Sequence, residues 1–278
     1  LSQEDRILLY SSARAVLSNR QGSLAEQVRR VKFSPTALTH EKPTRPLPAK
    51  VEKLVDESSL LYFQGLGGFS PDGKEYVIAL NPGEHTPAPW INVIANPNFG
   101  FQVSESGAGY TWSGNSRENQ ITPWLNDPVG DPSGEAFYLY DHDSSMLWSP
   151  TAWPIRQEGG SYLARHGHGY SQFEHISHGI RSELTQFVAL DTPVKISRLV
   201  LENRSGTVRK ISVTAYAEWV LGFSRSQMAP TTVTEMDEPS GALFAMNSRS
   251  NEFGARVSFL ACTRKVSSFT GDRTEFIG

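Results

Sequence analysis

The stretch SYLARHGHGYSQFEHISHGIRSELTQFVALDTPVKISRLVLEN, residues 161–203, decides the fold. Strand-like runs rich in β-branched and aromatic residues succeed each other here, and short turns with Gly or Pro separate them. Connections of a few residues require neighbouring strands to pair antiparallel, because a parallel return needs a long crossover. The stretch therefore predicts consecutive antiparallel strands.

The same signal extends to both sides of this stretch. In KEYVIAL (residues 74–80), Tyr76, Ile78 and Leu80 alternate with Val77 and Ala79, as in a strand with two different faces. Further runs are WINVIAN (90–96), FGFQVS (99–104), AFYLYD (136–141), MLWS (146–149), VRKISVTAYAEWVL (208–221), ALFAMN (242–247) and ARVSFLACT (255–263). About a dozen strands exceed one open sheet, so we expect an all-β fold in which two large antiparallel sheets stack over residues 59–278.

The front of the chain, residues 1–58, reads differently. Residues 1–31 show helical spacing of apolar side chains, and Gly22-Ser23 ends one helix and caps a second that carries Leu24, Val28 and Val31 on one face. Residues 34–50 contain four prolines and read as a linker. A short helical and proline-rich extension is therefore expected ahead of the β domain.

Composition excludes several classes of function. A net charge of -3 gives no basic footprint for nucleic acid, and no apolar run approaches the roughly 20 residues that span a bilayer. The single cysteine, Cys262, fits a reducing compartment and is expected to lie buried and inert in a strand. We expect a cytoplasmic protein, and, because the chain starts at Leu1, a piece of a longer one.

Residues 95–129, ANPNFGFQVSESGAGYTWSGNSRENQITPWLNDPV, combine tryptophans with amides, a guanidinium and a carboxylate among turn-forming residues. Aromatic rings cover the C–H faces of sugars, and planar polar groups bind neighbouring hydroxyls, so a carbohydrate-facing loop is one interpretation. The other is a long loop whose tryptophans fill a core and whose polar residues form turns. The candidate carbohydrate-binding residues are Trp112, Asn115, Arg117, Asn119, Trp124, Asn126 and Asp127.

Two other groups of residues invite a chemical interpretation. Four histidines (His166, His168, His175 and His178) lie close together, but strand geometry would point His175 and His178 to opposite faces, so we expect no metal site. A glycosidase pair needs carboxyls about 5 to 9 Å apart across a cleft. Nothing in the sequence pairs the candidates Glu174, Glu183 and Glu218, and no catalytic residue is predicted.

Three blocks carry a family resemblance. The run from Asn96 to Val129, GLGGFSPDGKEYVI (65–78) and LVLENRSGTVRKISVTAYAEWVLG (199–222) resemble the N-terminal domain of glycoside hydrolase family 94. These are the cellobiose-phosphorylase-like enzymes formerly called glycosyltransferase family 36, and the blocks look most like the domain in cyclic β-1,2-glucan synthases. The resemblance implies a β-supersandwich similar to galactose mutarotase.

The resemblance also implies a division of labour. In these enzymes a separate helical barrel, C-terminal to the sandwich, performs phosphorolysis with inorganic phosphate as co-substrate. The sandwich packs on the barrel, contributes to a homodimer and helps to wall the site for the β-glucan oligosaccharide. This chain would then be a non-catalytic domain, and a full-length synthase would work at the cytoplasmic side of the inner membrane.

Two alternatives remain open at this point. The domain could be a purely structural or dimerisation module, with residues 95–129 buried against the barrel. It could also be a stand-alone mutarotase-like sugar epimerase, which would need a His–Glu acid/base pair converging on the concave sheet.

Overall fold

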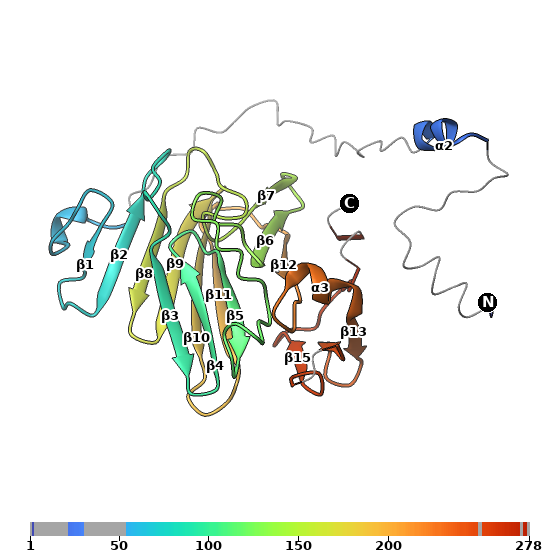
Figure 1. Cartoon of the computed structure of the whole chain (residues 1–278). Coiled ribbons are helices and arrows are strands. Elements are labelled where there is room, and N and C mark those ends of the chain that lie inside the picture. Colours follow the sequence, from blue (N-terminus) through green and yellow to red (C-terminus); the bar gives the residue numbers. More distant parts are fainter. Residues whose placement is uncertain (1, 3–21, 31–53, 250–251, 273–274, 277–278) are drawn as a thin grey trace. The chain divides into compact units, whose positions relative to one another are not determined.

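The computed structural model of the chain describes residues 2, 22–30, 54–249, 252–272 and 275–276 (Figure 1). The chain divides into two compact units, one made of Leu1–Lys42 with Cys262–Gly278 and the other of Pro43–Ala261. All fifteen strands among the described residues belong to the second unit. In the described part of the chain, no helix has the length and apolar character needed to span a membrane.

The first unit contains the helix α2 (Leu24–Arg30). Its start is a capping box, in which the Ser23 backbone N–H and hydroxyl both donate to the Glu26 carboxylate at 2.7 and 2.8 Å. These hydrogen bonds lower the pKa of Glu26. The helix predicted after Gly22-Ser23 is thus confirmed, whereas the helix expected before it and the proline-rich stretch 34–50 lie outside the described residues.

The largest element of the second unit is a six-stranded antiparallel sheet. The stretch 161–203 supplies four consecutive neighbours, and the two strands from residues 67–80 complete the sheet at the other edge. Tight turns at Gly169 and Gly179 join the strands with positive φ of 84° and 78°, a conformation that glycine adopts without strain. In spatial order the strands are β1 (Gly67–Phe69), β2 (Glu75–Leu80), β8 (Tyr162–Gly167), β9 (Tyr170–Ser177), β10 (Ile180–Val188) and β11 (Lys195–Asn203).

The two faces of this sheet differ in chemistry. What we call the inner face carries Ile78, Ala164, Phe173 and Leu184, which belong to the main hydrophobic core. On the outer face, Val77, Ala79 and Leu163 are covered by the segment around Leu54–Phe63, and the remaining positions are mostly charged. Alternation along each strand sorts the two sets, as the sequence predicts.

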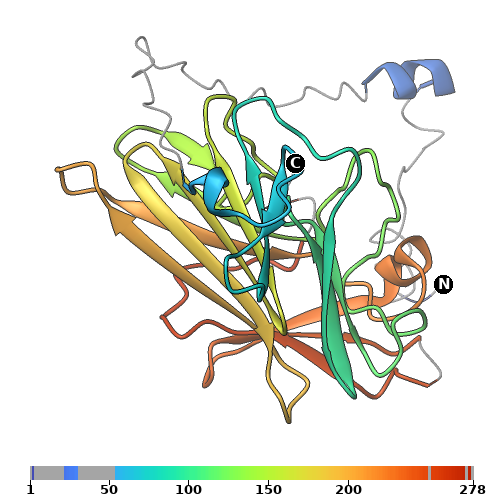
Figure 2. The same cartoon turned by 90° about the vertical axis from the view of Figure 1, so that its left-hand side faces the viewer.

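Two three-stranded sheets cover the inner face. The first consists of β3 (Ile91–Asn96), β4 (Phe99–Ser104) and β5 (Gly109–Ser113), and its Ile94, Phe101 and Val103 pack in the main core. Figure 2 shows this sheet, in teal and green, facing the yellow strands of the large sheet. The second has the order β12 (Ile211–Ala217), β6 (Glu135–Asp141) and β7 (Met146–Trp148), and its core holds Leu139, Trp148 and Ile180.

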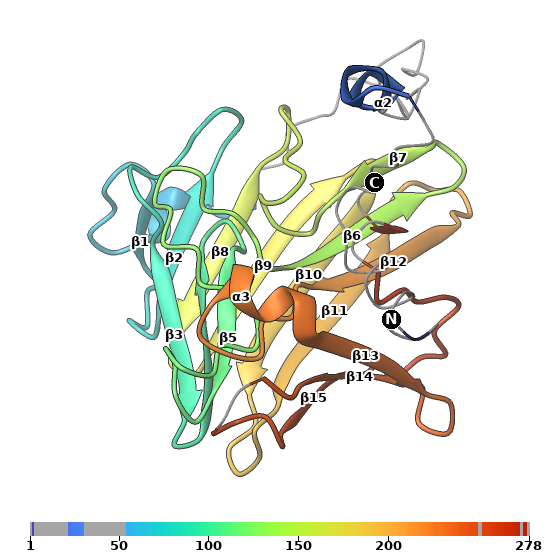
Figure 3. The same cartoon turned by 45° about the vertical axis from the view of Figure 1, so that its right-hand side comes forward.

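A fourth sheet follows near the end of the second unit. It contains β13 (Thr232–Asp237), β14 (Ala242–Asn247) and β15 (Val257–Leu260), and Figure 3 shows it below β12 and in front of β11. Three short helical elements complete the inventory: η1 (Glu57–Ser59), α3 (Arg225–Met228) and η2 (Ala229–Thr231). The fold is therefore all-β and antiparallel, as predicted.

Details differ from the prediction in three ways. The second layer is not one large sheet, because it is divided among three-stranded sheets. The strands β1, β5 and β13 were not predicted; β5 lies inside the stretch that reads as a loop. Cys262 was expected to be buried in a strand, and this is wrong: β15 ends at Leu260 and the free thiol is exposed.

Candidate functional site

Trp112 lies on strand β5, not in a loop as the sequence suggests. Directly opposite on β4 is Gly100, and an added Cβ at that glycine would lie 2.5 Å from Cζ2 of the Trp112 ring. The indole therefore lies across the backbone of Gly100. A side chain at this position of β4 would collide with the ring, which explains the glycine within the strand.

Three aromatic rings gather around β5. The ring centroids of Tyr110 and Trp112 are 5.2 Å apart, and Trp124 stacks on Tyr110 at 6.0 Å with an interplanar angle of 24°. Trp124 retains 50% exposure, whereas Tyr110 is buried. The group, which we call the β5 aromatic group, therefore presents the half-exposed Trp124 to solvent, backed by the buried Tyr110.

The amides after β5 serve the backbone. The Asn115 side-chain oxygen accepts from the backbone N–H groups of Arg117 and Glu118, each at 2.9 Å. Asn119 is buried and its amide donates to the Ser113 carbonyl at 2.7 Å. The turn they form displays Arg117, whose side chain is 89% exposed and whose Nε lies 3.4 Å from the Glu118 carboxylate.

The far end of the stretch is also a turn. Asp127 accepts from the backbone N–H groups of Val129 and Gly130 at 3.0 Å, and these bonds lower the pKa of Asp127. Asn126 adopts a positive φ of 43°, which asparagine tolerates well. Both residues are exposed.

The structure thus divides the seven candidates into two kinds. Trp112 and Trp124 meet in the β5 aromatic group, and Arg117 and Asn126 are exposed side chains without a buried role. Asn115, Asn119 and Asp127 hold turns and backbone together. The interpretation as a set of turns therefore applies to part of the stretch, and a sugar-facing surface stays a prediction for its exposed side chains.

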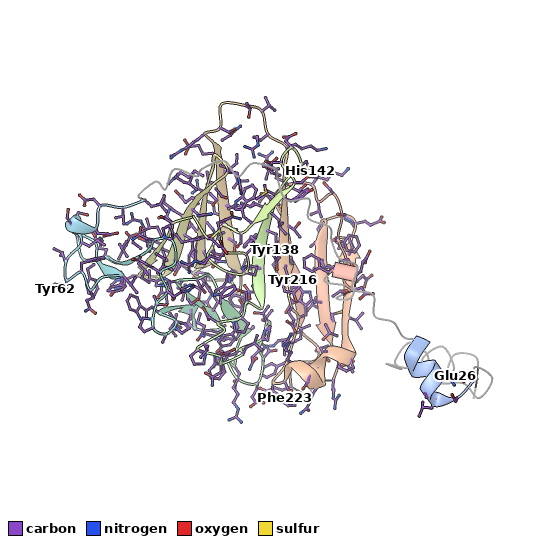
Figure 4. All side chains as sticks on the ribbon, turned by 90° about the horizontal axis from the view of Figure 1, so that it is seen from above. Glu26, Tyr62, Tyr138, His142, Tyr216 and Phe223 are labelled. Carbon is purple, nitrogen blue, oxygen red and sulfur yellow. The ribbon has the colours of Figure 1, made fainter. Side chains whose placement is uncertain are left out.

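A cavity of about 240 Å³ lies next to this stretch, and the sequence did not predict it. Its walls come from β4, β5, β6, β11, β12, β14 and β15, and Ser113 and Asn119 reach it from the candidate stretch. Tyr216 of β12 lines it too; Figure 4 labels this residue together with Tyr138 of the adjacent strand β6. The larger aromatic and aliphatic residues of the lining are Phe99, Ile121, Phe137, Val194, Tyr216, Trp219, Leu221, Phe253, Val257, Phe259 and Leu260.

An ion pair lies in the wall of this cavity. Lys195 Nζ donates to Glu135 at 2.6 Å and lies 4.2 Å from the centre of the Phe101 ring, while Thr111 and Thr122 donate to the other carboxylate oxygen at 2.5 Å. Burial alone would raise the pKa of Glu135, but Lys195 and the two hydroxyls lower it below its ordinary value. This carboxylate is therefore ionised and fully bonded, which suits an anchor between β5, β6 and β11 better than a proton donor.

A second carboxylate, also missed by sequence reasoning, lies under a group of loops. Glu105 is buried and accepts from the Thr86 hydroxyl and from the Trp90 backbone N–H at 2.7 Å. Burial raises the pKa of Glu105, and the nearby Asp131 acts in the same direction. Asp131 in turn accepts from the hydroxyls of Ser104 and Ser106 at 2.6 Å.

Among the described residues, the histidines join no group of three or more side chains that could hold a metal ion. His166 contacts the Ser171 hydroxyl and the Trp90 carbonyl, and His175 donates from Nδ1 to the Ser161 carbonyl at 2.9 Å. Burial lowers the pKa of His166 and of His175 to about 4. These hydrogen-bond partners of His166 and His175 are a hydroxyl and two backbone carbonyls.

The glutamates considered for a glycosidase pair are tied to arginines. Glu174 and Glu183 face each other across β9 and β10, and Arg181 contacts both, at 2.5 and 3.3 Å. Glu218 is paired with Arg225. These carboxylates therefore belong to structural ion pairs.

Comparison with known proteins gives consistent matches. The family described as "Glycosyl hydrolase 94, supersandwich domain" matches residues 74–278. The cyclic beta-(1,2)-glucan synthase NdvB of Rhizobium meliloti (strain 1021) is 38% identical over 97% of this chain and 10% of the synthase. The N,N'-diacetylchitobiose phosphorylase of Vibrio proteolyticus is 28% identical over 76% of this chain and 27% of the phosphorylase.

A third relative is the solabiose phosphorylase of Paenibacillus borealis, which is 30% identical over 58% of this chain and 21% of that protein. The chain therefore spans between about a tenth and about a quarter of the length of these relatives.

Proposed function

Because this chain belongs to the glycosyl hydrolase 94 supersandwich family, we propose that it is the non-catalytic sandwich domain of a larger enzyme of the cyclic β-1,2-glucan synthase type. In that enzyme the domain packs on a helical-barrel catalytic domain, which uses inorganic phosphate as co-substrate. The full-length enzyme works on the cytoplasmic side of the membrane, and the sandwich domain contributes to its homodimer. The domain itself helps to bind the β-glucan chain.

The observation that carries the glucan-binding role is the half-exposed Trp124, stacked on the buried Tyr110. An indole fixed in this way offers a flat apolar surface at little entropic cost, and glucose rings have apolar C–H faces that match it. The exposed guanidinium of Arg117, on the same stretch between β5 and β6, supplies donors for paired hydroxyls. Together they form a surface suited to a polyhydroxylated chain.

The non-catalytic role rests on how the carboxylates are used. Glu174, Glu183 and Glu218 are engaged by arginines, and Glu135 is engaged by Lys195 and two threonines. A general acid must be protonated at the pH at which the enzyme works, and Lys195 with the two threonines lowers the pKa of Glu135 despite its burial. Burial raises the pKa of Glu105, but this carboxyl is covered and accepts from Thr86 and Trp90. We expect the proton donor for the glycosidic oxygen on the barrel.

Substitution of Trp124 by Ala and of Arg117 by Ala in the full-length enzyme tests the glucan-binding role. Loss of one stacking ring costs about 1 kcal/mol, so we expect the acceptor KM to rise about five-fold or the glucan length distribution to shift. Val129→Ala is the control, because Val129 lies on the same stretch and is 93% exposed. Unchanged acceptor kinetics in both Trp124 and Arg117 variants would remove the assignment.

A purely structural role for the stretch is the second candidate, and the turn bonds of Asn115, Asn119 and Asp127 favour it. In that case the Trp124 and Arg117 variants lower the melting temperature of the full-length enzyme and leave its acceptor KM unchanged. Measuring both quantities on the same samples separates the two functions.

A further inference from the structure

We propose that the open edge of β11 accepts an added β-strand, and that this strand comes from the rest of the same polypeptide. The inference rests on the proposed function, in which the chain is one domain of a larger enzyme. The relatives it matches are between about three and about ten times its length, so such enzymes contain ample chain to supply a strand.

The backbone of β11 shows which groups are available. The ladder between β10 and β11 is flanked by hydrogen bonds from Ala189 N–H to the Val194 carbonyl and from Arg204 N–H to the Gly179 carbonyl. In an antiparallel pair, bonded positions alternate, so the even-numbered residues of β11 bond to β10. The N–H and C=O groups of the odd-numbered residues point to the open side, and these residues are Lys195, Ser197, Leu199, Leu201 and Asn203.

This edge lacks most of the features that normally protect an edge strand; the exception is Lys195 at its first position, whose side chain points inward to Glu135. Natural edges are short, bulged, or interrupted by proline or by charges that point inward. β11 is nine residues long, pairs with β10 in one unbroken register and contains neither proline nor glycine. The opposite edge of the same sheet, β1, has three residues only.

The three-stranded sheet of β12, β6 and β7, which covers the inner face of the large sheet, extends beyond β11. Val213 of β12 is paired with Leu139 of β6, and both side chains point toward the large sheet. Leu139 is fully buried, yet Val213 is 49% exposed. The large sheet therefore covers Ile211 at one end of β12 but leaves Val213 exposed, and one more strand beside β11 would lie beneath Val213.

Burial along the large sheet leads to the same conclusion. On the inner face of β10, Ile180 and Leu184 are each 2% exposed, whereas Leu199 and Leu201 of β11 are only partly buried. The cavity of about 240 Å³ also borders this edge, with Lys195 and Ser197 of β11 on one side and β15 on the other. An extended backbone, rather than a compact ligand, fits between two open strand edges.

The surroundings define the chemistry of the added strand. Positions beside Leu199 and Leu201 face the core and require apolar side chains, while alternate positions face outward. On the outward side Arg198 is 65% exposed, with its nearest carboxylate, Glu183, at 3.7 Å. We therefore expect the added strand to carry an acidic residue opposite Arg198, so that the two side chains form a cross-strand ion pair.

Amide hydrogen exchange at single-residue resolution tests the proposal. In the 278-residue chain, the amides of Leu199 and Leu201 should exchange rapidly, and those of Arg198 and Val200, bonded to β10, should be protected. In the full-length enzyme, we expect the odd-numbered amides to slow by about a hundredfold or more, because each gains a ladder hydrogen bond. Equal exchange of Leu199 and Leu201 in both proteins would overturn the proposal.

A pair of variants supplies a second measurement. Leu201→Pro removes the edge N–H as well as the leucine side chain, whereas Leu201→Ala removes the side chain and keeps the N–H. In the full-length enzyme the melting temperature of the proline variant should lie below that of the alanine variant. Equal melting temperatures would contradict the added strand.

Two further outcomes distinguish a failure of the added-strand proposal from a failure of the proposed glucan contact. Protection of Leu199 and Leu201 that grows with concentration in the 278-residue chain would assign the edge to a second copy and overturn the source proposed here. Normal glucan kinetics in the Trp124 and Arg117 variants, together with slowed edge amides in the full-length enzyme, would reject the proposed glucan contact and retain the added strand.

Discussion

Gly100 and Trp112 show how one missing side chain shapes the surface between β4 and β5. An added Cβ at Gly100 would lie 2.5 Å from the Trp112 ring and 2.7 Å from the Ala95 Cβ. Tyr110 packs against the same indole and supports Trp124 in turn. The position of the exposed ring thus depends on a residue that never reaches the surface.

We therefore expect Gly100→Ala to destabilise the domain by about 2 kcal/mol, because the methyl group forces the indole aside in a packed site. Urea unfolding measures this change. Gly159→Ala is the matched control, since an added Cβ there meets nothing within 4 Å. Similar urea midpoints for Gly100→Ala and Gly159→Ala would show that the Trp112 indole moves aside without a loss of stability.

At the scale of elements, ion pairs reinforce the ladders between neighbouring strands and, at Arg209, also join a strand to a turn of another sheet. On the outer face of the large sheet, Arg165 contacts Glu75 at 3.3 Å and Glu174 at 3.8 Å, and Arg181 continues the row to Glu174 at 2.5 Å. On the other layer, Arg209 contacts the fully buried Asp141 of β6 and donates to the His178 carbonyl at 2.8 Å. Arg209 thus ties β6 to the turn between β9 and β10.

Asp141→Asn should lower the free energy of unfolding at pH 7 by about 2 kcal/mol. Burial alone would raise the pKa of Asp141, but Arg209, Ser144 and the Asp143 N–H together lower it from 3.8 to about 2. A depressed carboxyl pKa stabilises the fold above pH 4, and the contribution disappears as the pH falls from 4 to 2. Urea unfolding of both proteins across this range measures the difference.

Asp143→Asn serves as the control for this prediction, because Asp143 lies in the same turn and is exposed. A destabilisation by Asp141→Asn that stays constant down to pH 2 would show that the ion pair with Arg209 is not its cause.

For the whole molecule, sequence patterns predicted the all-β antiparallel fold and most of its strands, because alternation and short turns are local signals. They missed β5 because Gly109–Ser113 is short and lies among glycines and serines. The pairing of Glu135 with Lys195 could not be predicted, because it joins residues 60 positions apart that meet only after the sheets have stacked. For the same reason the sequence did not separate the turn-forming amides from the exposed Trp124 and Arg117.

The pH dependence of global stability follows from two buried histidines. The folded pKa values of His166 and His175, about 4, lie below the ordinary 6.5, so between pH 6.5 and 4 the unfolded chain binds more protons. Stability is full above pH 6.5 and falls as the pH drops toward 4, by about 1.4 kcal/mol per pH unit for each histidine. Chemical unfolding at several pH values should show this slope.

The double variant His166→Gln/His175→Phe should flatten that slope, while His168→Gln, at an exposed turn position, should leave it unchanged. An unaltered slope in the double variant would assign the pH dependence to other groups.

Trp148 is fully buried on β7, and Trp124 is half exposed on the β5–β6 connection. Their fluorescence therefore reports on different events. Iodide should quench the emission of Trp124 and of Trp153, which is 39% exposed, and leave that of Trp148 unaffected until the sheets separate. A saccharide that covers Trp124 should reduce the iodide quenching while the protein stays folded. Trp124 thus gives an optical signal for saccharide binding, and Trp148 gives one for denaturation.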